Sequence, residues 1–133
     1  MIPRQHPAWL RRRRRGAPDR RMMQDLAAAM VAADECAIRD ILRPDAVAII
    51  DGGGLVAVPA TPVDGRFAAA AALVALSSDE TSATVASING VPGFVLSRND
   101  VVVAAVTAEA RARLLSSVWV VCNPDKLRHW NRG

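Results

Sequence analysis

The sequence predicts an α+β domain in which helices cover one face of a curved sheet. Residues 21–43 and 66–76 have the apolar spacing of helices, whereas 47–51, 55–58 and 81–121 have strand character with turn signals between the runs. One antiparallel sheet of about six strands, with three helices packed on one face, would bury this order of elements. The chain has 133 residues, of which 51% are apolar, and this suits a single core.

The first 21 residues differ in charge from the rest. Residues 1–21 carry a net charge of +7, with five adjacent arginines at 11–15, whereas residues 22–133 carry −3. We therefore predict an Arg-rich tail or linker remnant over 1–21 and one folded domain over 22–133. The arginine run is interpreted either as an arm that faces nucleic acid or polymerase, or as a solvated linker. A nucleic-acid-binding face on the acidic body is not expected.

Two helices are predicted before the first strand. Met22, Leu26 and Met30 lie at helical spacing and form an apolar stripe. Asp34 is expected to cap a second, short helix, because its carboxylate can accept a backbone N–H of the first turn. Pro44 is expected to stop that helix, because proline lacks the N–H and clashes with the preceding turn.

The second half of the chain predicts a four-stranded meander. Asn89-Gly90 favours a type I′ hairpin turn, since both positions must accept positive φ. Residues 108–113 are expected to form a connection, and 123–131 a polar tail with a turn or a single helical turn. The predicted strands are 81–88, 91–97, 101–107 and 114–121.

The stretch AIIDGGGLVAV at 48–58 raises the question of a phosphate or metal loop. No lysine follows the glycines and the next segment is a strand, so neither a phosphate loop nor a dinucleotide loop fits. Asp51 is the only acid, which is too few for a calcium loop. Two interpretations stay open, a plain hairpin turn and a docking loop whose bare peptide groups another chain can approach.

Cysteine and histidine spacing predicts no metal site and no cofactor. Cys36 and Cys122 are far apart, and His6 and His129 lie at opposite ends. Two reduced thiols are typical of a cytoplasmic protein. The apolar run at 26–33 is too short and too closely flanked by acids for a secretion signal, and no stretch reaches the length of a membrane span.

The order of elements and three motifs carry a resemblance to a known family. The elements match the cone-shaped domain of nuclear transport factor 2 (NTF2) and of SnoaL-like proteins. Asp51-Gly52-Gly53-Gly54, Asn89-Gly90-x-Pro92-Gly93 and Asn123-Pro124-Asp125-Lys126-Leu127 follow in this order. Together they resemble the SnoaL-like C-terminal extension of certain extracytoplasmic-function RNA polymerase sigma factors, over about residues 22–130.

This resemblance implies a non-catalytic regulatory domain that contacts a sigma-factor core and modulates transcription initiation. The implied protein-binding residues are Asp51, Gly52, Gly53 and Gly54 in one segment, and Asn123, Pro124, Asp125 and Lys126 in the other. The residue after the glycines is Leu55, where the family usually has a basic residue. The chain contains no promoter-reading helices, so it is not expected to recognise a promoter alone.

A second interpretation is a small-molecule-binding protein or an enzyme of the SnoaL or ketosteroid isomerase type, with the cone interior as its pocket. Asp40, Asp51 and Asp64 could each act as a general base, but the chain has no tyrosine to stabilise an enolate. His129 is expected to be exposed. We therefore predict that the domain is not an enzyme, that it could still bind a small molecule, and that the open sheet face allows a homodimer.

Overall fold

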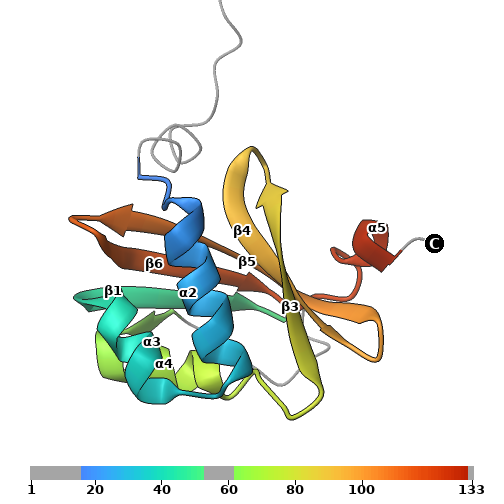
Figure 1. Cartoon of the computed structure of the whole chain (residues 1–133), viewed down its shortest axis with the longest axis horizontal. Helices are drawn as coiled ribbons and strands as arrows, with labels where there is room; N and C mark the ends of the chain where they lie inside the picture. Colours follow the sequence, from blue (N-terminus) through green and yellow to red (C-terminus); the bar gives the residue numbers. More distant parts are fainter. Residues whose placement is uncertain (1–15, 53–61, 132–133) are drawn as a thin grey trace, which may run out of the picture.

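The computed structural model describes residues 16–52 and 62–131, which form a six-stranded sheet with helices (Figure 1). The predicted strand at 55–58 lies outside the described residues. The elements are α2 (Arg20–Val31), α3 (Glu35–Ile41), β1 (Leu42–Asp51), β2 (Val63–Asp64), α4 (Arg66–Val74), β3 (Thr81–Ile88), β4 (Val91–Arg98), β5 (Val101–Arg111), β6 (Leu114–Val121) and α5 (Arg128–Asn131).

The sheet is mixed rather than wholly antiparallel. Its strand order is β2-β1-β6-β5-β4-β3, and β1 pairs in parallel with β6 while every other neighbouring pair is antiparallel. The meander from β3 to β6 was predicted from its turns. The pairing of β1 with β6 joins strands that no short turn connects, and local sequence signals do not report such contacts.

Helices α2, α3 and α4 lie on one face of the sheet, as predicted. In Figure 1, α2 crosses the sheet while α3 and α4 group near β1. The core between helices and sheet includes Met23, Leu26, Leu73, Phe94 and Val118, each fully buried. Each such side chain contributes about 1.5–3 kcal/mol through removal from water. We call this side of the sheet the helix face and the other side the open face.

Two aspartates begin the first helices. The Met22 N–H donates to Asp19 Oδ1 at 2.8 Å, and the Ala37 N–H donates to Asp34 Oδ1 at 3.0 Å. The second bond confirms the predicted cap. Helix α3 ends at Ile41, and Pro44 lies within β1 instead of stopping the helix. The register of β1 against β6 shifts between Leu42 and Val47. Pro44 lies in this interruption of the ladder, where its lack of a backbone N–H removes no hydrogen bond between the strands.

Strand β5 extends through residues that were expected to be a connection. It runs to Arg111, and only Ala112 and Arg113, with φ of 55° and 69°, form the turn. The helix-forming composition of 108–113 is overridden because Arg111 and Ala110 pair with Leu114 and Leu115 of β6. The predicted turn at Asn89-Gly90 is confirmed, with φ of 52° and 82°.

The N-terminal boundary of the body lies within the predicted tail. The Ala110 N–H donates to the Gly16 carbonyl at 2.6 Å, Pro18 is buried, and α2 begins at Arg20. Residues 16–21 therefore pack against the domain. The division into a tail over 1–21 and a domain over 22–133 stays a prediction, because residues 1–15 lie outside the described part. No helix in the described ranges is long and apolar enough to cross a membrane.

Gly93 permits a close approach between β4 and β5. A Cβ built at Gly93 would lie 2.6 Å from the Val106 carbonyl oxygen and 2.9 Å from Ile88 Cδ1. A Cβ at Gly90 would meet nothing within 4 Å, although its φ of +82° disfavours any L side chain. The first glycine is thus required by sterics, and the second only by backbone conformation.

We expect Gly93→Ala to lower the free energy of unfolding by about 1–3 kcal/mol, because a backbone carbonyl must move to admit the methyl group. Gly90→Ala should cost about 1 kcal/mol through its positive φ. Urea denaturation of the two variants measures the difference. A Gly93→Ala variant no less stable than Gly90→Ala would contradict the close-approach explanation.

Candidate functional site

The two predicted binding segments meet at one edge of the sheet. Because β1 and β6 are parallel, their carboxyl ends lie side by side, with Asp51 opposite Val121. The Cys122 N–H donates to the Asp51 carbonyl at 2.7 Å. The start of the glycine stretch, after Asp51, therefore lies next to the end of the last strand, before Asn123.

An ion pair links the two segments. Lys126 Nζ lies 2.5 Å from Asp51 Oδ2, and the two side chains are 61% and 34% exposed. An exposed pair of this kind contributes about 0–1 kcal/mol, so it adds little to stability. Its main effect is to hold a cation and a carboxylate in fixed positions at the surface.

The tail after β6 is a compact turn, as its Asn-Pro-Asp sequence predicts. Asn123 Oδ1 accepts the Asp125 N–H at 3.0 Å, which is the bond of an Asx turn. The Asn123 carbonyl accepts the N–H groups of Lys126 at 3.0 Å and Leu127 at 3.2 Å. Asp125 also pairs with Arg128 at 2.9 Å. The turn backbone is therefore fixed by its own hydrogen bonds.

Leu127 anchors this turn on the open face of the sheet. Leu127 is 2% exposed and packs with Val95 and Ala105. The residues on either side of Val95 and Ala105 belong to the core on the helix face, so Val95 and Ala105 themselves point to the open face. Trp130 of α5 packs against the same cluster. The sequence analysis treated 123–131 as a polar tail and did not recognise Leu127 as an anchor. Its i, i+3 spacing to Trp130 was the available signal.

At the end of the described tail, the Asn131 side chain hydrogen-bonds to the backbone of β5 as a neighbouring strand would. Its Oδ1 accepts the Val102 N–H at 2.7 Å, and its Nδ2 donates to the Val102 carbonyl at 3.0 Å. These two bonds replace the pairing that β6 no longer supplies beyond Val121. The tail is consequently held at both ends, by Lys126 on Asp51 and by Asn131 on Val102.

The predicted site residues are therefore largely brought together. We use the name β1–β6 edge for the surface formed by Asp51, Asn123, Pro124, Asp125 and Lys126. Of these, Pro124, Asp125 and Lys126 are exposed, and Asp51 and Asn123 are half-buried. Gly52 is buried beside them, and Gly53 and Gly54 lie outside the described residues.

The third motif borders a groove next to this edge. The turn at Asn89-Gly90 and the tail enclose a groove of about 390 Å³ on the open face, with Lys126 at its rim. Its walls and floor include Ile88, Asn89, Ala105, Val121, Leu127 and Trp130. Asn89 of the third motif thus lies at the same groove as the tail turn, whereas Gly90 and Pro92 line a separate recess with Arg20.

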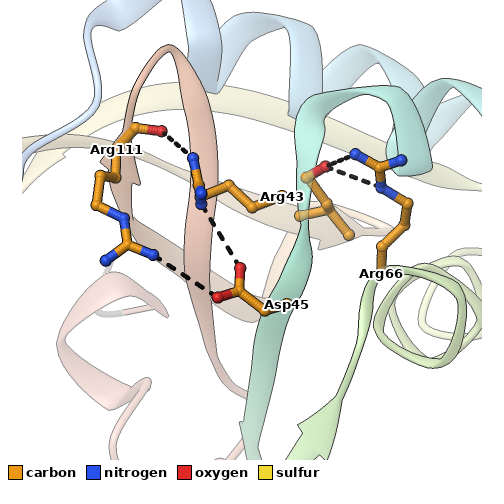
Figure 2. Close-up of polar contacts among 5 residues, drawn as sticks. Arg43, Asp45, Arg66 and Arg111 are labelled. Atoms are coloured by element: carbon orange, nitrogen blue, oxygen red, sulfur yellow. Dashed lines mark hydrogen bonds and ion pairs between the residues drawn. The ribbon is translucent and has the colours of Figure 1, made fainter.

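A different polar network lies at the other end of β1. Figure 2 shows the Arg66 guanidinium donating to the Leu42 carbonyl, at 2.8 and 3.1 Å, where α3 ends and β1 begins. Asp45 lies 3.5 Å from Arg43 Nε and 3.7 Å from Arg111 Nη2, and Arg43 donates to the Arg111 carbonyl at 3.2 Å. These contacts join β1 to α4 and to the end of β5, and we assign them a structural role.

A cavity of about 450 Å³ opens between the end of α4, the β4–β5 turn and the C-terminal tail. Arg98, Cys122 and Asn131 lie among an otherwise largely apolar lining. The sequence analysis assigned no role to Arg98, because a lone arginine at a hairpin end carries no recognisable motif. Of the possible bases, Asp40 and Asp64 lie on α3 and β2, away from this lining.

The described residues include no group of three or more His, Cys, Asp or Glu side chains that could hold a metal ion. Nothing in the described lining suggests a cofactor, and the side chain of His129 lies outside the described part of the structure.

The open face retains half-buried apolar side chains on β1, among them Val47 and Ile49. A homodimer through this face stays a prediction.

Comparison with solved structures decides the fold. An NTF-2 like protein of unknown function from Burkholderia xenovorans LB400 aligns with 86% of this chain and 93% of its own, at 18% identity and a TM-score of 0.57. The chain has the NTF2-like fold. The α+β class with helices on one face of a curved sheet is thereby confirmed, with one parallel strand pair in place of the wholly antiparallel sheet expected.

Two further NTF2-like neighbours have different functions in their descriptions. The extracytoplasmic function sigma factor SigJ of Mycobacterium tuberculosis aligns with 80% of this chain at 21% identity and a TM-score of 0.62, but the alignment spans only 42% of SigJ. A proposed ketosteroid isomerase from Kribbella flavida DSM 17836 aligns with 77% of this chain and 75% of its own, at 14% identity and a TM-score of 0.56. No protein-family model and no curated protein gives a significant match to the sequence.

The two cysteines differ in environment. Cys36 is exposed, and Arg39 Nη2 donates to its sulfur at 2.7 Å, whereas Cys122 is 8% exposed. Burial raises the pKa of the Cys122 thiol above its ordinary value of 9.0, and the Asp51 carboxylate raises it further, against an opposing effect of Arg98. The Cys122 thiol therefore stays protonated at neutral pH.

We expect iodoacetamide to modify Cys36 rapidly and Cys122 slowly, because the thiolate is the reactive species and Cys122 is both protonated and shielded. In a Cys36→Ser variant, the remaining rate should rise only above pH 9.0, the ordinary thiol value. Mass spectrometry over a pH series measures both sites. Equal rates with the same pH midpoint would contradict the assignment.

Proposed function

We propose that this domain is a non-catalytic, cofactor-free regulatory module that binds the core of an extracytoplasmic-function sigma factor and thereby modulates transcription initiation. The observation that carries the proposal is the assembly of Asp51 and the 123–126 turn into one surface, the β1–β6 edge. Such contact with RNA polymerase components would take place in the cytoplasm, the location that the sequence predicts.

The β1–β6 edge has the properties of a preorganised protein-binding surface. Its turn is held by the Asn123 side chain and by the buried Leu127, so little conformational entropy is lost when a partner binds. Asp125 and Lys126 present opposite charges, which favours a partner of complementary pattern and one orientation. The adjoining groove supplies apolar surface on Leu127 and Trp130, where a partner side chain can be buried.

The comparison with SigJ supports the same interpretation. The aligned segment covers 42% of SigJ, so most of that protein lies outside the shared fold. We infer that the present domain depends on a separate or adjoining sigma core for promoter recognition. Its own part would be to contact that core through the β1–β6 edge, with Gly52, Gly53 and Gly54 contributing backbone groups beside Asp51.

Small-molecule binding is a second candidate, because the cavity of about 450 Å³ is of a size that ligands occupy. Ketosteroid isomerase chemistry needs a base together with a donor to the enolate. The ionisable side chains found in the described lining are Arg98 and Cys122, and the chain has no tyrosine. Binding without catalysis is therefore the form of this candidate that we retain.

We expect the double variant Asp125→Lys/Lys126→Glu to bind a sigma core at least about tenfold more weakly than the natural chain, since loss of about 1.4 kcal/mol at an interface corresponds to a factor of ten. The partners to test are the sigma-factor cores encoded in the same genome, each immobilised and titrated by biolayer interferometry.

The matched control is Glu80→Lys/Arg113→Glu, which makes the same charge changes at exposed positions on two other turns. Thermal unfolding verifies that both double variants are folded. Binding by neither the natural chain nor the control to any sigma core, or equal binding by all three proteins, would remove the proposal.

A further inference from the structure

The cavity of about 450 Å³ exists because β5 is longer than its neighbour β6. The last paired residues are Ala105 and Val121, and the chain then leaves the sheet at the 123–127 turn. The four residues Val101–Ala104 project beyond this point, and among the described residues no strand pairs with them on that side. The side chain of Asn131 hydrogen-bonds to the backbone of Val102, and both residues line the cavity.

The lining of this cavity is largely apolar. Leu76 follows α4, Val103 and Ala104 belong to β5, and Pro124 and Leu127 belong to the tail turn. These side chains come from three separate parts of the chain and enclose a space that is large enough for a small organic molecule. The apolar lining favours an apolar ligand body.

Arg98 introduces a positive charge into this apolar setting. Its Nη2 donates to the Leu76 carbonyl at 2.9 Å, and its Nε donates to Thr81 Oγ1 at 3.3 Å. Thr81 is itself fixed, because its Oγ1 accepts the Ser78 N–H at 3.0 Å. Both acceptors of Arg98 are neutral, so they orient the guanidinium without neutralising it.

No carboxylate in the described ranges pairs with Arg98. The acids nearest in the sequence, Asp79, Glu80 and Asp100, are exposed and form no ion pair with Arg98, and Asp51 has Lys126 Nζ at 2.5 Å. The Cys122 thiol is kept protonated by burial, which raises its pKa, and so adds no negative charge to the lining. A half-buried cation without a counterion is costly, and an anion placed beside it relieves that cost.

We propose that this cavity binds a small monocarboxylic acid with an apolar body. The remaining guanidinium N–H groups of Arg98 bind the carboxylate, and charge-assisted hydrogen bonds of this kind are stronger than neutral ones. The apolar body lies against Val103, Ala104 and Leu127. The proposal is for binding without catalysis. The cavity shares Pro124 with the β1–β6 edge, but neither Asp125 nor Lys126, the residues exchanged in the sigma-binding test, contributes to its lining.

The test is isothermal titration of the full chain with octanoate and with 3-phenylpropionate, each paired with its neutral alcohol, octanol or 3-phenylpropanol. We expect the acids to bind, with dissociation constants on the order of micromolar to millimolar, and the alcohols to bind at least about tenfold more weakly. The two acids distinguish a fatty acid from an aromatic one. Absence of binding by both acids, or equal binding by acid and alcohol, would overturn the proposal.

Three variants locate the carboxylate. Arg98→Gln should weaken acid binding at least about tenfold, Arg98→Lys should retain part of it, and the matched control Arg113→Gln should leave it unchanged. Because Arg98 also holds the Leu76 carbonyl, urea denaturation accompanies each titration. If Arg98→Gln does not fold, Arg98→Lys and the comparison of acid with alcohol decide the question.

A second readout uses the cavity's own thiol. In the Cys36→Ser background, saturating octanoate should slow the alkylation of Cys122 severalfold, because Cys122 lies in the lining. Octanol at the same concentration should have little effect. Protection that is equal for acid and alcohol, or that persists in Arg98→Gln, would contradict a carboxylate site at Arg98.

Discussion

The parallel pairing of β1 with β6 is the contact on which the rest of the structure depends. It joins the first long strand to the last one, and so makes one continuous sheet against which the helices and the core pack. Because the strands run in the same direction, their carboxyl ends coincide, and two segments that are 71 residues apart in the sequence become neighbours. The candidate binding surface follows from this pairing rather than from either segment alone.

Polar contacts hold β1 at both of its ends, but in different ways, and Figure 2 shows those at its start. At its start, Arg43 and Asp45 contact Arg111 of β5, and Arg66 of α4 donates to the Leu42 carbonyl. At its finish, one pair joins Asp51 to Lys126. The first arrangement links β1 to two other elements through several contacts, whereas the second is a single ion pair between the end of β1 and the tail turn.

The two sheet faces are covered by different parts of the chain. Helices bury the helix face, while the part of the described chain that packs on the open face is the tail, through Leu127 and Trp130. The groove and the cavity both lie where this small cover meets the strands. Among the described residues, the tail covers part of the open face, and the recesses on which the binding proposals rest lie at its margin. The extra length of β5 determines where the larger recess lies.

The sequence by itself determined the α+β class, the Asp34 cap, the hairpin at Asn89-Gly90 and the turn at Asn123-Pro124-Asp125, because each depends on side chains that act within a few residues. Only the tertiary structure decided the β1–β6 pairing, the extension of β5 over 108–111, the burial of Leu127 and the contacts of Arg98 with Leu76 and Thr81. Each of these depends on contacts between residues distant in the chain, and local propensity carries no information about which distant segments will meet.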